Sequence, residues 1–201
     1  MRKAVGQDIG EEGGSSENAG EVAETAKPLK LYQRQCTAVG IRPQAKVANA
    51  LQTPMVDLKH YGVGARGAIA IGACLHTEAK VHELCLTDNL LGEAGGYAIA
   101  HALANNTILT KLDLRDNRIG SRAATALFDS LSKNKTLTSL SVERNLLDDA
   151  VNMQGLFNNK TLTLLDVSRN SLVSCGIACR FLAGDPIPIN RETLRLLSWR
   201  I

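Results

Sequence analysis

The sequence has few aromatic residues and lacks the features of membrane and secreted proteins. Phe, Trp and Tyr together supply seven of its 201 residues, and no apolar run approaches the roughly 18 residues of a membrane-spanning helix. Residues 1–8 do not contain the apolar core of a secretory signal. The five cysteines are odd in number and follow no disulfide framework, so we expect reduced thiols. These absences predict a cytoplasmic protein that makes no contact with a membrane.

No group of residues has the spacing of a catalytic or metal site. Cys175 and Cys179 are four residues apart, which would place both on one face of a helix, but neither a CxxC motif nor a His pair supplies further ligands. The four histidines show no metal-ligand spacing, and the sequence has no paired-carboxylate motif or nucleophile elbow. We therefore predict no metal, no cofactor and no enzymatic activity for this chain.

Charge of both signs is present but is unevenly distributed along the chain. Residues 1–26 carry two basic and six acidic residues, a net charge of −4, whereas the other 175 residues carry 21 basic and 14 acidic residues, a net charge of +7. The basic residues are scattered and have few aromatic neighbours, so we do not expect nucleic-acid binding. Residues 1–26 also lack an apolar period, which predicts a disordered acidic tail.

What the sequence does contain is leucine, at 28 of 201 positions, arranged in a repeating frame. Four stretches have the form L-x-L/V-x-x-N-x-L/I, at residues 84–91, 112–119, 140–147 and 165–172. Their asparagines are spaced 28, 28 and 25 residues apart, and residues 56–63 repeat the frame with Tyr in the Asn position. The alternating apolar positions at the start of each stretch predict a short strand.

The second half of each repeat has the spacing of a helix. Apolar residues recur at i, i+1 and i+5, as in Ala70, Ile71 and Leu75, which suits one helix face. An asparagine three residues before the next repeat is expected to end each helix in the left-handed conformation that Asn tolerates. These asparagines are Asn106, Asn134 and Asn159. The fourth repeat is three residues shorter, so its helix, near residues 149–157, should lose about one turn.

This pattern resembles the leucine-rich repeat, and its 28-residue period with a helical second half resembles the ribonuclease-inhibitor-like class over about residues 55–182. The resemblance implies an α/β fold. It would be a right-handed curved solenoid, a fragment of a leucine-rich-repeat horseshoe, with a parallel sheet on the concave side and helices on the convex side. Residues 32–43 are also similar to the lead-in of leucine-rich-repeat proteins of motile cilia and flagella, with an unrelated helical cap as the alternative.

The repeat frame divides the chain into three parts. They are the tail at residues 1–26, a helical N-terminal cap at residues 27–54, and a repeat array at residues 55–201 with about five repeats and a partial sixth strand. The last nine residues match residues 136–144 position by position and stop one residue before a sixth Asn. We favour a truncated fragment of a longer array, with a cap formed by Trp199 or an edge covered by a partner as alternatives.

A GxGxxG motif at residues 62–67 has a separate explanation. This motif also occurs in dinucleotide-binding proteins, between a strand and a helix. Gly64, however, falls at the same repeat position as Gly92 and Gly120, where each repeat turns into its helix. The repeat frame accounts for the glycines, so we do not predict nucleotide binding.

The asparagines of the frame are predicted to have a structural role. An Asn that points inward carries both a donor and an acceptor, so it can satisfy the backbone groups left open by the turn after each strand. This predicts a continuous ladder formed by Asn89, Asn117, Asn145 and Asn170.

The outward residues of the strands are predicted to form the binding surface. They line up in columns that mix acidic, basic and small polar groups, which suits recognition of a protein partner. The predicted contact residues are Lys59, Lys111, Asp113, Arg115, Asp116, Glu143 and Arg144. We therefore interpret the chain as a non-enzymatic protein-interaction module or scaffold. The alternatives are a regulator of a small GTPase, similar to the Ran GTPase activator, a structural component of a ciliary or flagellar assembly, and a solvated face without a partner.

Overall fold

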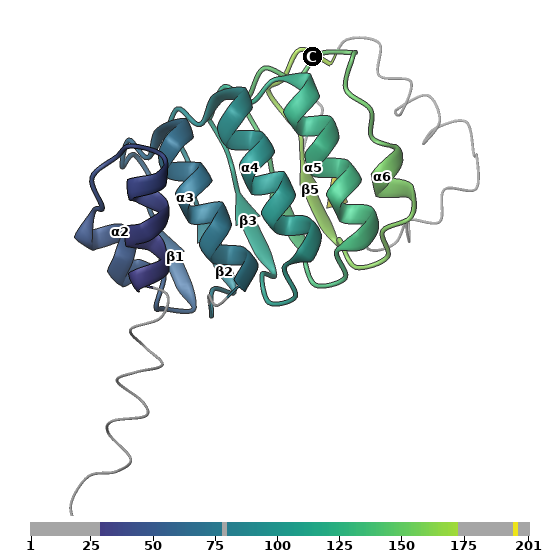
Figure 1. Ribbon diagram of the computed structural model, residues 1–201. Helices are drawn as coiled ribbons and strands as arrows, with labels where there is room; N and C mark the ends of the chain where they lie inside the picture. Colours follow the sequence, from purple (N-terminus) through teal and green to yellow (C-terminus); the bar gives the residue numbers. More distant parts are fainter. Residues whose placement is uncertain (1–28, 78–79, 173–194, 197–201) are drawn as a thin grey trace, which may run out of the picture.

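The computed structural model describes residues 29–77, 80–172 and 195–196 (Figure 1). The predicted tail at residues 1–26, the Cys175–Cys179 pair and the predicted cap at Trp199 lie outside the described residues. The described part forms a mixed α/β structure in which strands and helices alternate along the chain.

The strands form a single parallel sheet whose order follows the sequence, β1-β2-β3-β4-β5-β6. They are β1 (Met55–Asp57), β2 (Glu83–Cys85), β3 (Lys111–Asp113), β4 (Ser139–Ser141), β5 (Leu164–Asp166) and β6 (Arg195–Leu196). Met55 lies opposite Glu83, and Glu83 lies opposite Lys111. This register equals the repeat period, so equivalent positions of successive repeats lie side by side.

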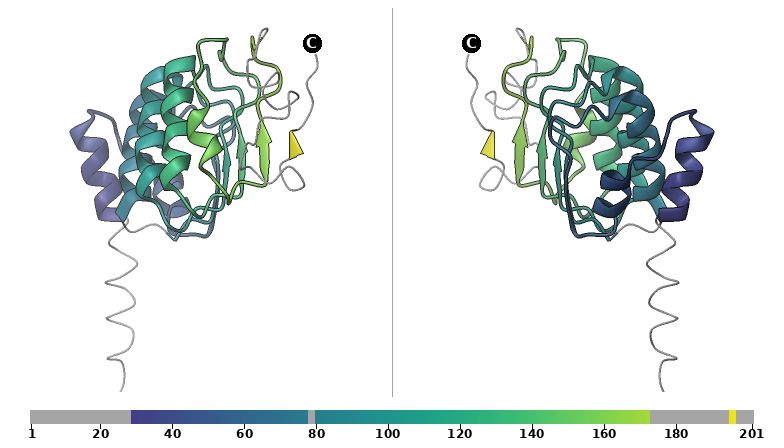
Figure 2. Two further views of the ribbon diagram at one scale, coloured as in Figure 1. Left: turned by 90° about the vertical axis from the view of Figure 1, so that its right-hand side faces the viewer. Right: turned by 90° about the vertical axis from the view of Figure 1, so that its left-hand side faces the viewer.

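The helices form a second layer against one face of the sheet (Figure 2). They are α3 (Gly64–Thr77), α4 (Gly92–Asn105), α5 (Ser121–Lys133) and the short α6 (Gln154–Phe157). Small residues allow close approach between neighbouring helices. A Cβ atom on Gly72 of α3 would lie 2.9 Å from the carbonyl oxygen of Ala98 on α4, so a larger residue there would separate the two helices.

The core lies between the two layers. In β2, β3 and β4 the central leucines Leu84, Leu112 and Leu140 are at most 1% exposed, whereas the residues on either side of them are at least partly accessible. Burying each of these side chains contributes about 2 kcal/mol of transfer free energy. The strand periodicity therefore directs one face of the sheet into the core and leaves the other face outside it.

A helical segment precedes the first strand. Residues 29–38 are helical and are followed by Gly40, whose φ of 71° places it in the left-handed region at the helix end. A second helix, α2 (Ala45–Ala50), leads to β1. The Nζ atom of Lys46 lies 4.6 Å from the centre of the Tyr61 ring, so a cation–π contact connects α2 to the first repeat.

The asparagines at the helix ends close the turns with their side chains, whereas the sequence predicts that their backbones do so. Asn106 and Asn134 have extended backbones, with φ of −76° and −66°, so the predicted left-handed conformation is wrong. The Oδ1 atom of Asn134 instead accepts hydrogen bonds from the backbone N–H groups of Thr136 and Leu137 at 3.0 and 2.8 Å. Its Nδ2 atom donates to the carbonyl oxygen of Leu103 in the preceding repeat at 2.9 Å. The side chain, and not the backbone, closes the turn.

The helix of the fourth repeat is shorter than predicted. The sequence predicts a helix over residues 149–157, but α6 covers only the last four of these residues. Two side chains hold the preceding segment in turns. Asp148 Oδ1 and Asn152 Oδ1 each accept a hydrogen bond from the backbone N–H group two residues further along, at 3.0 and 2.9 Å. Such local bonds compete with helix formation, so the helix begins only after Asn152.

Candidate protein-binding surface

The asparagines of the repeat frame lie in the turns that follow the strands. Asn117 is fully buried, and its Oδ1 atom accepts hydrogen bonds from the backbone N–H groups of Asn89 and Leu91 at 3.0 and 3.4 Å. Its Nδ2 atom donates to the carbonyl oxygens of Leu86 and Arg115 at 2.7 and 2.9 Å. One side chain therefore satisfies backbone groups of its own repeat and of the preceding repeat.

The same arrangement recurs in the other repeats. Asn89 Oδ1 accepts from the N–H groups of Tyr61 and Val63 at 3.1 and 3.0 Å, and Asn170 Oδ1 accepts from the N–H group of Asn145 at 3.0 Å. Tyr61, which replaces Asn in the first repeat, contributes only its backbone N–H group to this network. The asparagine row fixes the strand ends of successive repeats relative to one another.

The face of the sheet opposite the helices is termed here the open sheet face, and no described helix lies on it (Figure 2). It consists of the strand and strand-end side chains that alternate with the core residues. In the first repeat these are Met55, Asp57, Lys59 and His60, and the later repeats place their equivalents beside them in four columns. Side chains from distant parts of the sequence therefore lie next to one another on this face.

A chain of charged groups crosses the open sheet face from β3 toward β5. Arg115 contacts Asp113 of its own strand end at 2.5 Å and Glu143 of the next repeat at 4.0 Å. Glu143 in turn contacts the Nε atom of Arg169 at 3.4 Å. The charges alternate in sign along this chain, so each side chain restrains the next.

Further ion pairs also connect neighbouring repeats. Arg144 Nε lies 3.3 Å from Asp116 Oδ1, and Lys111 Nζ lies 3.3 Å from Glu83 Oε2. The side chains of both basic residues are more than half exposed, so each pair contributes at most about 1 kcal/mol to stability. Their main effect is to hold the charged groups in a fixed pattern.

The structure brings six of the seven predicted contact residues together in these ion pairs, and the exception is Lys59. That side chain is exposed and forms no ion pair with a described residue. Two members of the network, Glu83 and Arg169, were not among the predicted contacts, although the repeat register places both in the outward columns. Thr87, also in an outward column, is only 5% exposed because Asp113 and Cys85 lie against it.

Arg115 holds the neighbouring carboxyl group in its charged form. Burial by itself would raise the pKa of Asp113. Hydrogen bonds from the side chain and the backbone N–H group of Arg115, together with the guanidinium charge, outweigh burial and keep this pKa below its usual value. Asp113 therefore stays ionised through the neutral and mildly acidic range.

Replacing Arg115 with Gln should reduce stability at neutral pH by about 1 kcal/mol, since solvent screens the partly exposed pair. The folded-state pKa of Asp113 lies below the unfolded-state value of about 3.9. The pair is therefore stabilising above that value, and its contribution is lost as pH falls through the folded-state pKa. Urea unfolding at several pH values should show the stability difference between the two proteins shrinking as the pH falls below the unfolded-state pKa of about 3.9, while Arg122→Gln on α5 should leave the pH profile unchanged. A constant difference at every pH would contradict this role.

The fourth column of the open sheet face has an unusual backbone. His60, Asp88, Asp116, Arg144 and Arg169 all have φ values between 52° and 56°, in the left-handed region. The turn imposes this conformation at every strand end, and it directs charged side chains to the rim of the sheet. His60 Nδ1 lies 2.7 Å from Asp88 Oδ2, so the rim contacts also link the first two repeats.

Leu90 and Leu146 offer a matched test of this backbone strain. They occupy the same repeat position and are 53% and 61% exposed, but only Leu90 has a positive φ, of 55°. Leu90→Gly should raise the free energy of unfolding by about 1 kcal/mol because glycine removes the left-handed strain. Leu146→Gly should lower it by about 0.5 kcal/mol through the entropy of the unfolded chain. Equal losses in urea unfolding of both variants would show that the strain is negligible.

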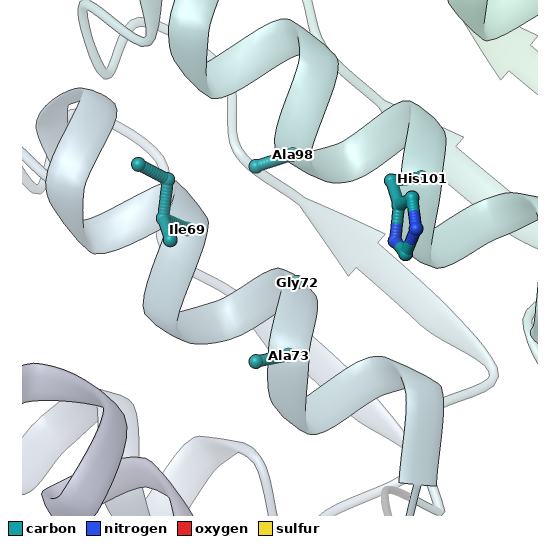
Figure 3. Close-up of a pocket in the computed structure, with 5 residues that line it drawn as sticks. All are labelled: Ile69, Gly72, Ala73, Ala98 and His101. Carbon is teal, nitrogen blue, oxygen red and sulfur yellow. The ribbon is translucent and has the colours of Figure 1, made fainter. Parts of the chain in front are cut away.

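A hollow lies on the helix side of the structure, between α3 and α4 (Figure 3). It has a volume of about 400 Å³ and is lined by Ile69, Gly72, Ala73, Ala98 and His101. The small residues leave the space, and the lining is mostly apolar, with His101 as its single titratable side chain. It offers few polar groups for specific recognition compared with the open sheet face.

Within residues 29–77, 80–172 and 195–196, no helix has the length and apolar character needed to cross a membrane. The same ranges contain no group of three or more His, Cys, Asp or Glu residues that could hold a metal ion.

Similarity to known proteins lies in the fold. No protein-family profile matches the chain, and no curated protein sequence matches it. Among solved structures, Leiomodin-1 Actin-Binding Site 2 is similar, with a TM-score of 0.53 and 17% sequence identity over 78% of this chain and 84% of that chain. The chain thus has a leucine-rich-repeat-like α/β fold with a single all-parallel sheet. The likeness supports the leucine-rich-repeat-like fold that the sequence predicts, and it is consistent with a protein-interaction module.

Proposed function

We propose that this chain is a non-enzymatic protein-interaction module that contacts a protein partner through the open sheet face. The observation that supports the proposal is the chain of charges from Asp113 to Arg169, held in register by parallel strands while helices cover the opposite face. A fixed pattern of alternating charges favours partners with the complementary pattern and disfavours others. The three described cysteines are free thiols, in keeping with action in the reducing cytoplasm.

We also propose that the repeats form a right-handed curved solenoid of the ribonuclease-inhibitor-like class, with the open sheet face on its concave side. The support is the 28-residue period shared by the strand register. Strands stack about 4.8 Å apart, whereas packed helices need about 8–10 Å. Stacking both in one array bends it toward the strands. The binding face would then be an inward-curving surface that surrounds part of the partner.

Actin filaments are the first defined partner to test. The similar solved structure is described as an actin-binding site, and at 17% identity the likeness concerns the fold. Sedimentation with actin filaments is a direct assay for this candidate. Stimulated GTP hydrolysis by a small GTPase would instead favour the regulatory alternative.

The decisive variant exchanges the charges of one ion pair. Asp116→Arg combined with Arg144→Asp keeps an ion pair at the 3.3 Å contact but reverses its direction. Binding through the open sheet face should then weaken at least tenfold, because like charges meet across the interface. The matched control is Arg122→Asp with Asp129→Arg on the exposed side of α5, which should bind normally.

The measurement compares the proteins cross-linked to each variant in a cytosolic extract, together with sedimentation on actin filaments. Circular dichroism and thermal melting establish that both variants are folded. Partners lost from the Asp116/Arg144 exchange and retained by the Arg122/Asp129 exchange support the proposal. Identical partners for all three proteins would show that the open sheet face is not the binding surface.

A further inference from the structure

The open sheet face contains a cavity between β1, β2 and β3. Its volume is about 240 Å³, and residues of all three strands line it. The side chains around it are those of Met55, Asp57, Glu83, Cys85, Lys111 and Asp113. Cys85 belongs to the middle strand of the three, and the register places this small residue between Asp57 and Asp113. Of these residues, only Lys111 and Asp113 belong to the contacts predicted from the sequence.

The charge around the cavity is unbalanced. Its lining carries three carboxylates, those of Asp57, Glu83 and Asp113, against the single ammonium group of Lys111, a net charge of −2. Glu83 and Asp113 already contact basic side chains. Asp57 accepts one hydrogen bond, from the backbone N–H group of Lys59 at 3.0 Å, and forms no ion pair with a described residue. The cavity therefore lacks a cation on the Asp57 side.

The rim beside this carboxylate is apolar. Met55 is 68% exposed at the first position of β1, the largest exposure among the large hydrophobic side chains of the described residues. Lysine and arginine side chains combine a charged end with an aliphatic stem, which packs along apolar surface. A flexible methionine side chain can adapt its shape to such a stem. The combination of an unpaired carboxylate and an exposed methionine matches both parts of a basic side chain.

We propose that the β1–β3 part of the open sheet face docks a partner protein by a lysine or arginine side chain that enters the cavity beside Cys85. Its charged end would lie between Asp57 and Glu83, and its stem would lie against Met55. This inference rests on the proposed function, because it specifies the chemistry of the partner at that same surface. It adds a specific contact at the first three strands, next to the Asp113 end of the charge chain.

Cys85 provides a way to test the chemistry of the cavity with small probes. Thiol–disulfide exchange with cystamine attaches an aminoethanethiol group and releases cysteamine, whereas exchange with dithiodiglycolate attaches a carboxymethylthio group and releases thioglycolate. Cys36 and Cys74 are at most 1% exposed, and burial raises the pKa of Cys74 to about 12, so both are unreactive. The full chain with serine at the two cysteines outside the described residues leaves Cys85 as the reporting thiol.

Incubation with equal amounts of both disulfides should favour the cationic adduct at Cys85 by about tenfold, relative to the same protein unfolded in urea. Peptide mapping by mass spectrometry gives this ratio at Cys85 in both states, because unfolding also exposes the thiols of Cys36 and Cys74. Asp57→Asn with Glu83→Gln should bring it close to the unfolded reference, whereas Asp129→Asn on α5 should leave it unchanged. A ratio within twofold of the unfolded reference, or a preference for the anionic adduct, would overturn the proposal.

A second measurement uses peptides in place of disulfides. The pentapeptides Gly-Leu-Lys-Leu-Gly and Gly-Leu-Glu-Leu-Gly differ only in the sign of the central charge. In NMR titrations the lysine peptide should shift the amide signals of β1–β3, and the glutamate peptide should not. Equal shifts from both would overturn the cavity proposal. Because neither assay uses a natural partner, a failure here is distinct from a failure of the Asp116/Arg144 exchange, which tests the proposed function itself.

Discussion

Replacing Asn117 with alanine should lower the free energy of unfolding by about 4 kcal/mol. The side chain is fully buried and makes four hydrogen bonds with backbone groups. Each bond contributes about 1 kcal/mol, and the buried groups left unpaired cost at least as much. Urea unfolding followed by circular dichroism measures the loss.

The matched control is Asn105→Ala, at the exposed end of α4. It should change stability by no more than about 0.5 kcal/mol, as is usual for an exposed position. Asn170→Ala should lie between the two, because its side chain is only partly buried. If Asn117→Ala behaved like the exposed control, the asparagine row would not be a major source of stability.

Gly155→Ala should be the next most damaging substitution, with a loss of about 3 kcal/mol. Gly155 is buried on α6, and a Cβ atom there would overlap the carbonyl group of Phe128 and lie 2.6 Å from the Cα atom of Asp129. These are backbone atoms of α5 and cannot turn aside as a side chain would. The alanine variant therefore has to move α6 away from α5, which opens the core of the fourth repeat.

Gln154→Ala is the control for this substitution, because Gln154 lies beside Gly155 on the same helix but is exposed. It should leave stability nearly unchanged. Amide hydrogen exchange should localise the effect of Gly155→Ala to α6 and β5, while α3 and α4 keep their protection, since repeats contact only their neighbours. Uniform loss of protection through the whole array would contradict this local mechanism.

The strand positions could be predicted from the sequence because their signal is strictly periodic. A 28-residue step brings Leu84, Leu112 and Leu140 to the same core position, and the parallel register reproduces that step. Side-chain alternation in a strand then separates the core from the open sheet face. The columns of that face follow from the same arithmetic, which is why most of the residues in its ion pairs could be named from spacing alone.

Features that depend on local side-chain contacts could not be predicted in this way. The length of α6 depends on whether Asp148 and Asn152 bond to the turn or leave the backbone free to form a helix. Asn134 can end a helix by its backbone or by its side chain, and the spacing is the same in both cases. The cavity beside Cys85 depends on which side chains neighbouring strands place at equivalent positions, and a repeat consensus does not record these differences.

The asparagine row gives the array a polarity. Each amide oxygen accepts from N–H groups of the turn on its N-terminal side, as when Asn145 receives the N–H groups of Asn117 and Ile119 at 3.1 and 2.9 Å. Replacing one asparagine therefore leaves N–H groups of the preceding repeat without their acceptor. The asparagine of the following repeat keeps its own side-chain hydrogen bonds to the backbone. The supporting hydrogen bonds therefore run toward the first strands, where the cavity beside Cys85 lies, so removal of an asparagine between them weakens the link between that cavity and the repeats that follow.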